Sequence, residues 1–295
     1  MVTNLTNDTA KTKDIMLDVI LALLPTSLFG IILFGWRAAL LIAVCIACSI
    51  LFEFLCCKLL RRENTIKDLS AAVTGLLLAL CLPSSLPIWM AVIGCFVAIV
   101  VVKQMFGGLG NNFVNPVACA RAVLLVSFPF YMSTYYTPFL DATASATPLA
   151  STDTSFKELF FGTHAGSIGE TSVAMLLIGG LYLFIRGVIK PTIPLAFIGS
   201  VAAITYAFGG NGLTAICSGG LILGAIFMAN DYVTSPTTFI GKIIFGIGCG
   251  TFTFIIRSGN AAEGVCFAIL FMNLLVPYID KLSSLVTSRW EVLKK

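Results

Sequence analysis

Charged side chains are scarce in this sequence. They make up 11% of its 295 residues, whereas a soluble domain carries about a quarter. Hydrophobic residues make up 58%, and the mean hydropathy is +0.99. Apolar runs of roughly 17–25 residues, long enough to cross a bilayer core of about 30 Å, recur along the chain. The composition therefore predicts an all-α, polytopic membrane protein in contact with the lipid bilayer.

Motifs of common enzymes are also missing. The chain has one histidine and no Ser-His-Asp set, paired-cysteine redox motif or metal-hydrolase motif. His164 has no visible partner, so we expect it at the surface. The ten cysteines lie mostly inside apolar runs, and only Cys45 and Cys48 share a helix face at close spacing. Without a second pair at metal-ligand spacing, packing residues are favoured over an iron–sulfur or zinc site, and we expect no metal.

The apolar runs predict ten transmembrane helices and the side of the membrane on which each loop lies. If the N-terminus is cytoplasmic, 14 of the 18 basic residues fall on the cytoplasmic side, the others being Arg37, Arg121, Lys157 and Arg257. The positive-inside rule then places both termini in the cytoplasm. A nucleic-acid-binding role for the basic cluster at 58–67 has less support, so no nucleic acid is expected. The predicted spans are 15–35, 38–57, 69–82, 86–102, 116–130, 172–185, 191–208, 212–229, 239–256 and 264–280.

The two halves of the chain resemble each other. Val117 and Val265 open similar segments that close at Pro129 and Pro277, an offset of 148 residues in both cases. Five spans per half invert the second half relative to the first, as in many transporter cores. We therefore predict a cytoplasmic tail at 1–14, a five-helix half at 15–130, an extracytoplasmic loop at 131–171, an inverted five-helix half at 172–280 and a cytoplasmic tail at 281–295.

The third span of each half ends in a Ser/Pro-rich segment, at 82–87 and at 230–236. Non-helical backbone near membrane depth needs protein or a water-filled cavity around it, so a ligand or ion cavity is one interpretation. An ordinary interfacial loop is the other. Asp231, with Thr234 close by, and Glu263 lie near span ends, where acids pair with another group, mark an ion path or cap a helix.

A glycine- and asparagine-rich turn precedes the fifth span. It reads "GGLGNNFVNP" from Gly107 to Pro116 and contains Asn111, Asn112 and Asn115, with Arg121 five residues further on. Glycines allow close backbone approach to a ligand, and a charge inside a span usually faces a cavity or a partner. A binding pocket and a tight structural turn both explain these residues. The pattern is not a nucleotide-binding fingerprint, because the strand–turn–helix context is missing.

Several long stretches resemble a known family. "KQMFGGLGNNFVNPVACARAVLLVSFP" (103–129) and "MANDYVTSP" (228–236), with "IFGIGCGTFTFIIR" and "AEGVCFAILFMNLLVPYID", are similar to the D subunit of the Rnf ion-translocating electron transport complex. That family is related to the B subunit of the sodium-pumping NADH:quinone reductase. The resemblance covers residues 15–285, which is nearly the whole chain.

The resemblance implies a covalent flavin in the polar loop. In the family this loop carries Asp-x-x-Ser/Thr-Gly-Ala-Thr, and the last threonine is esterified through the phosphate of FMN. Asp141 and Thr147 match the first and last positions, whereas Ala144 and Ser145 replace the usual Ser/Thr and Gly. Thr147 is therefore the expected FMN phosphoryl threonine, with Asp141 and Ser145 in its motif. Thr143 lacks the Ala-Thr context and is the less suitable acceptor.

The function implied by the family is electron relay between ferredoxin and NAD, coupled to Na⁺ or H⁺ translocation. It implies a subunit that is not catalytic alone, with the A, B, C, E and G subunits of the Rnf complex as partners and a flavin transferase for maturation. The related quinone reductase protein also holds non-covalent riboflavin, for which the turn at 107–121 is the candidate here. A stand-alone channel or carrier for a small solute also explains the repeat, but it gives no reason for the Thr147 motif.

Overall fold

The computed structural model describes residues 2–62, 65–138, 144–145, 156–259 and 264–293. Within these ranges, only the backbone is described at 2–11, 144–145 and 287–293. The chain is predominantly helical. Four helices contain a stretch long and apolar enough to cross a membrane: α1 (Val2–Phe34), α2 (Trp36–Leu59), α12 (Phe239–Gly259) and α13 (Val265–Leu293).

Shorter apolar helices lie between the long ones. They are α3 (Ser70–Leu80), α4 (Ile88–Phe96), α5 (Pro116–Ser127), α8 (Val173–Ile185) and α9 (Thr192–Ala207). Two segments are π-helical: η2 (Val97–Gln104), which continues α4, and η3 (Gly224–Met228), which continues α11 (Leu221–Leu223). The remaining elements are η1 (Ile66–Asp68), α6 (Pro129–Met132), α7 (Phe156–Phe161), α10 (Gly212–Cys217), β1 (Tyr135–Tyr136) and β2 (Ala144–Ser145).

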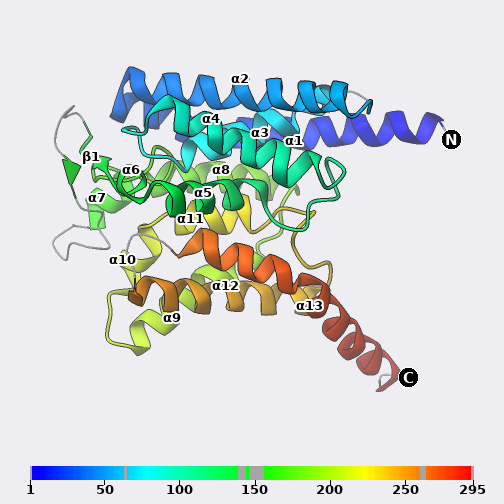
Figure 1. The fold of residues 1–295 in the computed structure, drawn as a ribbon. Coiled ribbons are helices and arrows are strands. Elements are labelled where there is room, and N and C mark those ends of the chain that lie inside the picture. The colour runs from blue at the N-terminus through cyan, green and yellow to red at the C-terminus, as the bar shows by residue number, and fades with distance from the viewer. Residues whose placement is uncertain (1, 63–64, 139–143, 146–155, 260–263, 294–295) are drawn as a thin grey trace.

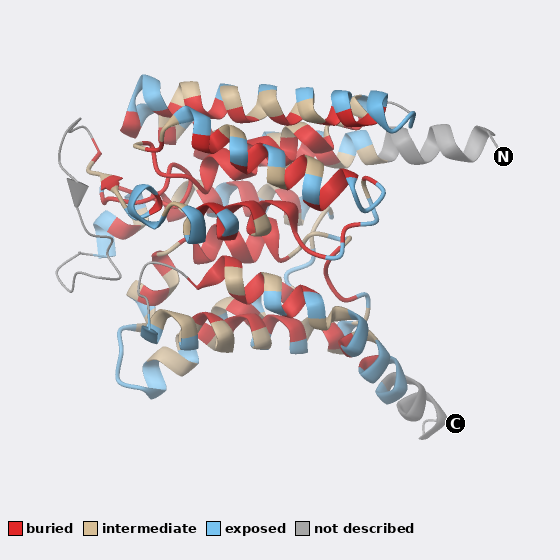
Figure 2. Ribbon diagram, viewed as in Figure 1, coloured by how far each residue is buried: buried red, intermediate tan, exposed pale blue. Residues whose placement is uncertain are grey.

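The helices form layers with the shortest ones inside. In Figure 1, α2 lies on one outer side and α9 with α12 on the other, while α3, α5 and α11 lie between them. The N- and C-terminal ends of the chain lie at one end of this assembly, and β1, α6, α7 and α10 lie at the opposite end (Figure 1). The inner helices are buried almost throughout, whereas α2 and α9 each present an exposed side (Figure 2). Leu51, Phe54 and Leu55 on α2 are exposed apolar side chains, as expected of a lipid-facing surface.

Each predicted apolar span lies on helical structure, but one of them is not a continuous helix. The span predicted at 212–229 is interrupted after α10 by Ser218, Gly219 and Gly220 before α11 begins. The two glycines have φ angles of 62° and 66°, in the left-handed region that residues with a Cβ seldom adopt. The break follows because this backbone cannot continue a right-handed helix.

A polar segment near the end of the predicted loop is buried. Residues 164–172, named here the strap, pack inside the helical assembly. The N–H groups of Ile168 and Gly169 donate to the carbonyls of Leu82 (3.0 Å) and Leu80 (2.8 Å) at the end of α3. The prediction that His164 is a surface residue is wrong, because its side chain is only 6% exposed. The burial of the strap could not be predicted from its polar sequence, because the burial depends on contacts with distant helices.

Candidate functional site

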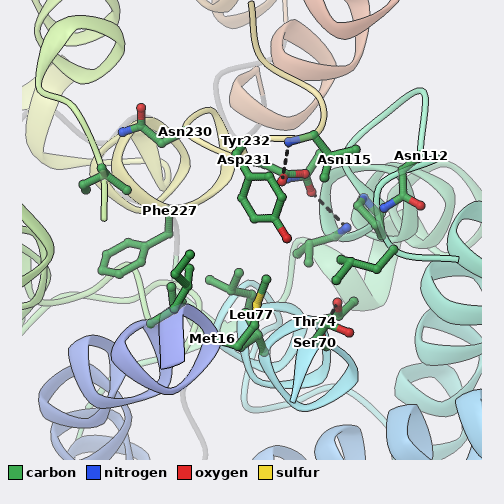
Figure 3. Close-up of a pocket in the computed structure, with 18 of the residues that line it drawn as sticks. Met16, Ser70, Thr74, Leu77, Asn112, Asn115, Phe227, Asn230, Asp231 and Tyr232 are labelled. Carbon is green, nitrogen blue, oxygen red and sulfur yellow. Dashed lines mark hydrogen bonds between the residues drawn. The ribbon is translucent and has the colours of Figure 1, made fainter. Parts of the chain in front are cut away.

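One cavity of about 220 Å³ lies where the broken segments of both halves meet. Its walls come from α1, the first turns of α3, the end of η2, the 105–115 turn, the start of α5, the end of α8, and η3 with the residues that follow it. Phe227 and Tyr232 reach toward the cavity from one side, and Met16 and Leu77 lie on the opposite side (Figure 3). Both π-helices contribute lining residues, and π-helical segments occur frequently at functional sites.

Asn115 joins the two halves at this cavity. Its Oδ1 accepts hydrogen bonds from the N–H groups of Val117 and Ala118, both 3.0 Å, and so caps the N-terminus of α5. Its Nδ2 donates to the Met228 carbonyl at the end of η3 (3.0 Å). The Asn115 N–H donates to Oδ1 of Asn273 on α13, also at 3.0 Å. One amide side chain therefore satisfies backbone groups exposed by two different helix breaks.

Asn273 is a functional candidate that sequence reasoning missed. It is 2% exposed in the middle of α13, and its Nδ2 donates to the Thr234 carbonyl at 2.9 Å. In the sequence, Asn273 is a single amide in an otherwise apolar run. Such a residue usually has a buried polar partner, and this is the signal that could have marked it as a candidate. The structure shows that this partner is the non-helical segment after η3.

The glycine-rich turn requires its glycines. Gly107, Gly108 and Gly110 have φ angles of 121°, 90° and 91°, a backbone conformation that favours glycine. Asn111 is exposed and donates weakly to the Gly107 carbonyl (3.4 Å), away from the cavity. Asn112 lines the cavity and is 7% exposed, and its Oδ1 has no hydrogen-bond partner among the residues described. The turn thus combines a structural constraint with one buried acceptor facing the cavity.

A buried charge network forms another part of the wall. Lys103 Nζ lies 2.7 Å from Glu53 Oε2 and donates to Ser70 Oγ at 2.6 Å. Ser70 in turn donates to Asp68 Oδ1 at 2.5 Å, and Thr65 donates to the other Glu53 oxygen. The Lys103 and Glu53 side chains are 1% and 0% exposed. Glu53, an acid inside a predicted span, is therefore a paired charge.

The residues predicted to form an ion path make local contacts. Asp231 lines the cavity, accepts the Val233 N–H on one oxygen and the Thr234 hydroxyl on the other, both at 3.2 Å, and so closes a turn. Thr234 is buried. Arg121 is outside the cavity lining and lies against Glu170 of the strap, with Nη1 and Oε2 3.8 Å apart.

Several predicted residues cannot be placed in this geometry. Asp141, Thr147 and Glu263 lie outside the described residues. Ser145 is described by its backbone alone, which pairs with Tyr135 in the two-stranded sheet. The cavity therefore unites Asn112, Asn115 and Asp231, and it does not include the described part of the flavin-attachment motif.

The fold and the cavity define a helical membrane protein whose broken helices meet around one buried, partly polar site. The chain belongs to the NQR2, RnfD, RnfE family, whose family model matches residues 3–287.

Curated relatives agree with this assignment. The D subunit of the Na(+)-translocating ferredoxin:NAD(+) oxidoreductase complex of Acetobacterium woodii is 44% identical, over 92% of this chain and 88% of the relative. The D subunit of the proton-translocating ferredoxin:NAD(+) oxidoreductase complex of Clostridium ljungdahlii is 41% identical, over 90% and 88%. The D subunit of an ion-translocating oxidoreductase complex from Stutzerimonas stutzeri is 39% identical, over 90% and 89%.

Proposed function

We propose that this chain is the membrane-embedded D subunit of an ion-translocating ferredoxin:NAD oxidoreductase complex. In this proposal it relays electrons through FMN esterified to Thr147 and couples the relay to Na⁺ or H⁺ translocation. The observation that carries the proposal is the similarity to proteins of that name over about nine-tenths of the chain, together with the segment from Asp141 to Thr147. Its partners are the A, B, C, E and G subunits, and a flavin transferase attaches the FMN.

The backbone next to the motif supports attachment at this loop. Ala144 and Ser145 pair with Tyr136 and Tyr135 in an antiparallel ladder. Tyr135 is buried, and the neighbouring Thr134 carbonyl accepts a hydrogen bond of 2.5 Å from Ser85. Ser145, two positions before Thr147, is thus tied to the helical assembly. β1 lies at the end opposite both chain termini (Figure 1), which supports placing the flavin and the termini on opposite sides of the membrane. In this proposal the membrane is the cytoplasmic membrane, the termini are cytoplasmic and the flavin is extracytoplasmic.

The same proposal includes ten transmembrane helices in two inverted halves. The positions of the short helices support it. α3 and α11–η3 occupy corresponding places in the two sequence halves, and Cys81 at the end of one contacts Met228 at the end of the other (3.9 Å between sulfurs). Asn115 bonds to both η3 and α13 of the second half. Interrupted helices that meet inside a bundle are typical of inverted-repeat transporters.

We propose the cavity as the site of a second, non-covalent flavin, riboflavin. Its walls are largely apolar, and Asn112 Oδ1 is a buried acceptor that a ligand N–H would satisfy. The volume of about 220 Å³ is below the roughly 300–1,000 Å³ of drug-sized sites, so the cavity must widen to take the whole riboflavin molecule. Asn112 and Asn115 would hold the ring, and bound riboflavin would supply a further electron-carrying centre. Asn111 and Arg121 lie outside this site.

The proposal covers either transported ion. Relatives of similar identity are named for sodium in one case and protons in the other. Asp231, Thr234 and Glu263 remain the proposed path residues, and carboxylate and hydroxyl oxygens suit either ion.

Peptide mass analysis of the complex purified from its native host tests the flavin proposal. The peptide holding Thr147 should be heavier by FMN less water, and its flavin fluorescence should survive denaturation. Thr147→Ala should abolish the modification, whereas the matched control Thr143→Ala should retain it. Full recovery of the unmodified peptide from a host with a working flavin transferase would contradict the relay, and the solute-carrier hypothesis would then be preferred.

A further inference from the structure

The strap carries a buried ion pair that the proposed electron relay does not use. Glu170 in the strap faces Arg121 on α5, with Oε2 and Nη1 3.8 Å apart. Their side chains are 4% and 5% exposed, respectively. A charged pair at this depth in a membrane protein is usually connected with function.

The pair is loosely held. A charge-assisted hydrogen bond between nitrogen and oxygen measures about 2.7–2.9 Å, and the Arg121–Glu170 separation is well beyond that. Glu170 Oε1 accepts the Ser167 N–H at 2.9 Å. Glu170 Oε2 and Ser167 Oγ are both buried, and neither has a hydrogen-bond partner among the residues described. Two neighbouring oxygens are thus available to a small ligand.

The break before α11 brings backbone close to this carboxylate. Gly220 lies beside Glu170, and a Cβ added there would be 2.9 Å from Oε2. The other charged or titratable groups nearby are His164 in the strap, Glu158 on α7 and Arg257 on α12. Arg257 donates to the carbonyls of Ala215, Ser218 and Gly219, at 2.7–3.2 Å, and so caps the end of α10. Arg121 is the cation that faces the carboxylate.

We propose that Glu170 and Ser167 form an exchangeable site for a small hard cation, Na⁺ or H⁺. Carboxylate and hydroxyl oxygens are the ligands that hard cations prefer. Arg121 is the tethered counter-charge, which neutralises Glu170 when the cation is absent. The inference rests on the proposed function in one respect, namely that the complex moves such an ion. The site lies beside the α10–α11 break and is separate from the Asn115 cavity.

Thermal unfolding of the purified complex tests the site without relying on turnover. Arg121→Gln leaves the Glu170 charge uncompensated, so the cation should become its main partner. Raising NaCl at constant ionic strength, with choline chloride as balance, should increase the Tm of this variant by about 3 °C or more relative to wild type. The control Arg121→Gln/Glu170→Gln removes both charges and should show no sodium-specific shift.

A second series at fixed Na⁺ distinguishes the proton. If the site binds H⁺, lowering the pH should stabilise Arg121→Gln relative to the double variant, and sodium should have no specific effect. If neither series separates the two variants, the site does not exist. Protonation stabilises any buried carboxylate that has lost its counter-charge, so a pH effect alone does not establish a proton site, and the transport measurement decides that case.

Transport by inverted membrane vesicles separates failure of this inference from failure of the proposed function. With ferredoxin and NAD supplied, the number of ions moved per NADH formed should fall about tenfold or more in Glu170→Gln, as expected for loss of a charged ligand. Wild-type vesicles that move no ion would overturn the proposed function. Wild-type and Glu170→Gln vesicles that move equal numbers of ions per NADH would overturn the site alone.

Discussion

At the scale of single residues, His164 shows how burial changes a side chain that looks unremarkable in the sequence. Its Nδ1 lies 3.2 Å from the Glu158 carbonyl, and because a carbonyl only accepts, Nδ1 must carry the hydrogen. Burial lowers the pKa of His164, and the contact with Glu158 together with the charges of Glu170 and Glu158 opposes that shift in part. The imidazole is therefore neutral at pH 7, because the effect of burial on its pKa exceeds that of the two carboxylates.

This pKa shift predicts a pH-dependent stability. Since the folded pKa is below the unfolded value of about 6.5, the unfolded chain binds more protons between the two values, and stability rises with pH there. The contribution is complete above about pH 6.5 and is lost as the pH falls through that value toward the folded pKa. Tm measured from pH 8 to pH 5 should fall more for wild type than for His164→Asn. Parallel curves would show that His164 is not the group that titrates.

At the scale of elements, η2 explains why a charge at the end of a predicted span is buried. Lys103 follows an apolar run and counts among the cytoplasmic basic residues in the topology prediction. In a π-helix each turn contains an extra residue, so the residues that follow change their position around the axis. Lys103 instead points toward Glu53 on α2 and Ser70 on α3, and its ammonium ties three elements together.

The stability of this junction can be measured with a double-mutant cycle. Lys103→Met should lower the free energy of unfolding by about 3–5 kcal/mol, because it leaves Glu53 buried without its counter-charge. Lys103→Met/Glu53→Gln removes both charges and should be more stable than the Lys103→Met single variant. Chemical unfolding of the purified complex with wild type, each single variant (Lys103→Met and Glu53→Gln) and the double variant, followed by a signal from this chain, gives the coupling energy. A coupling energy of zero would mean that the pair contributes nothing.

The apolar spans could be predicted from the sequence because hydrophobic length alone determines them, and their helices lie where expected. The 82–87 and 230–236 breaks were also visible as Ser/Pro-rich interruptions. The strap was not, because Gly166, Ser167 and Glu170 are polar or small, and their burial depends on the packing of the strap against distant segments that include α1, α3, α5 and the start of α11. Asn112 and Asn115 were predicted as candidates, but their meeting with Asp231 depends on how the two halves pack. That packing follows from contacts between distant residues, which a single sequence does not reveal.

At the scale of the whole molecule, two polar regions lie on different sides of the helix breaks. The cavity contains Asn115 and Asp231 and is bounded by the start of α3 and the end of η3. The strap site contains Glu170 and Arg121 and lies beside the end of α3 and the start of α11. Since α3 and α11–η3 are both short, each ends inside the protein, and each has one end at the cavity and the other near the strap. The same two short helices therefore connect the cavity and the strap, and a shift of either helix is a physical route between them.

The proposed orientation of these sites depends on which end of the molecule faces the cytoplasm. Lys157 on α7 and Ser284 in the C-terminal part of α13 are both exposed, and in Figure 1 α7 lies at the end of the helical assembly opposite the one at which α13 ends. The ten native cysteines are buried or half-buried, so their background labelling should be low. A membrane-impermeant maleimide applied to intact cells should label Lys157→Cys at once and Ser284→Cys only after permeabilisation. Labelling of Ser284→Cys in intact cells, with Lys157→Cys protected, would invert the topology and move the Thr147 loop to the cytoplasm.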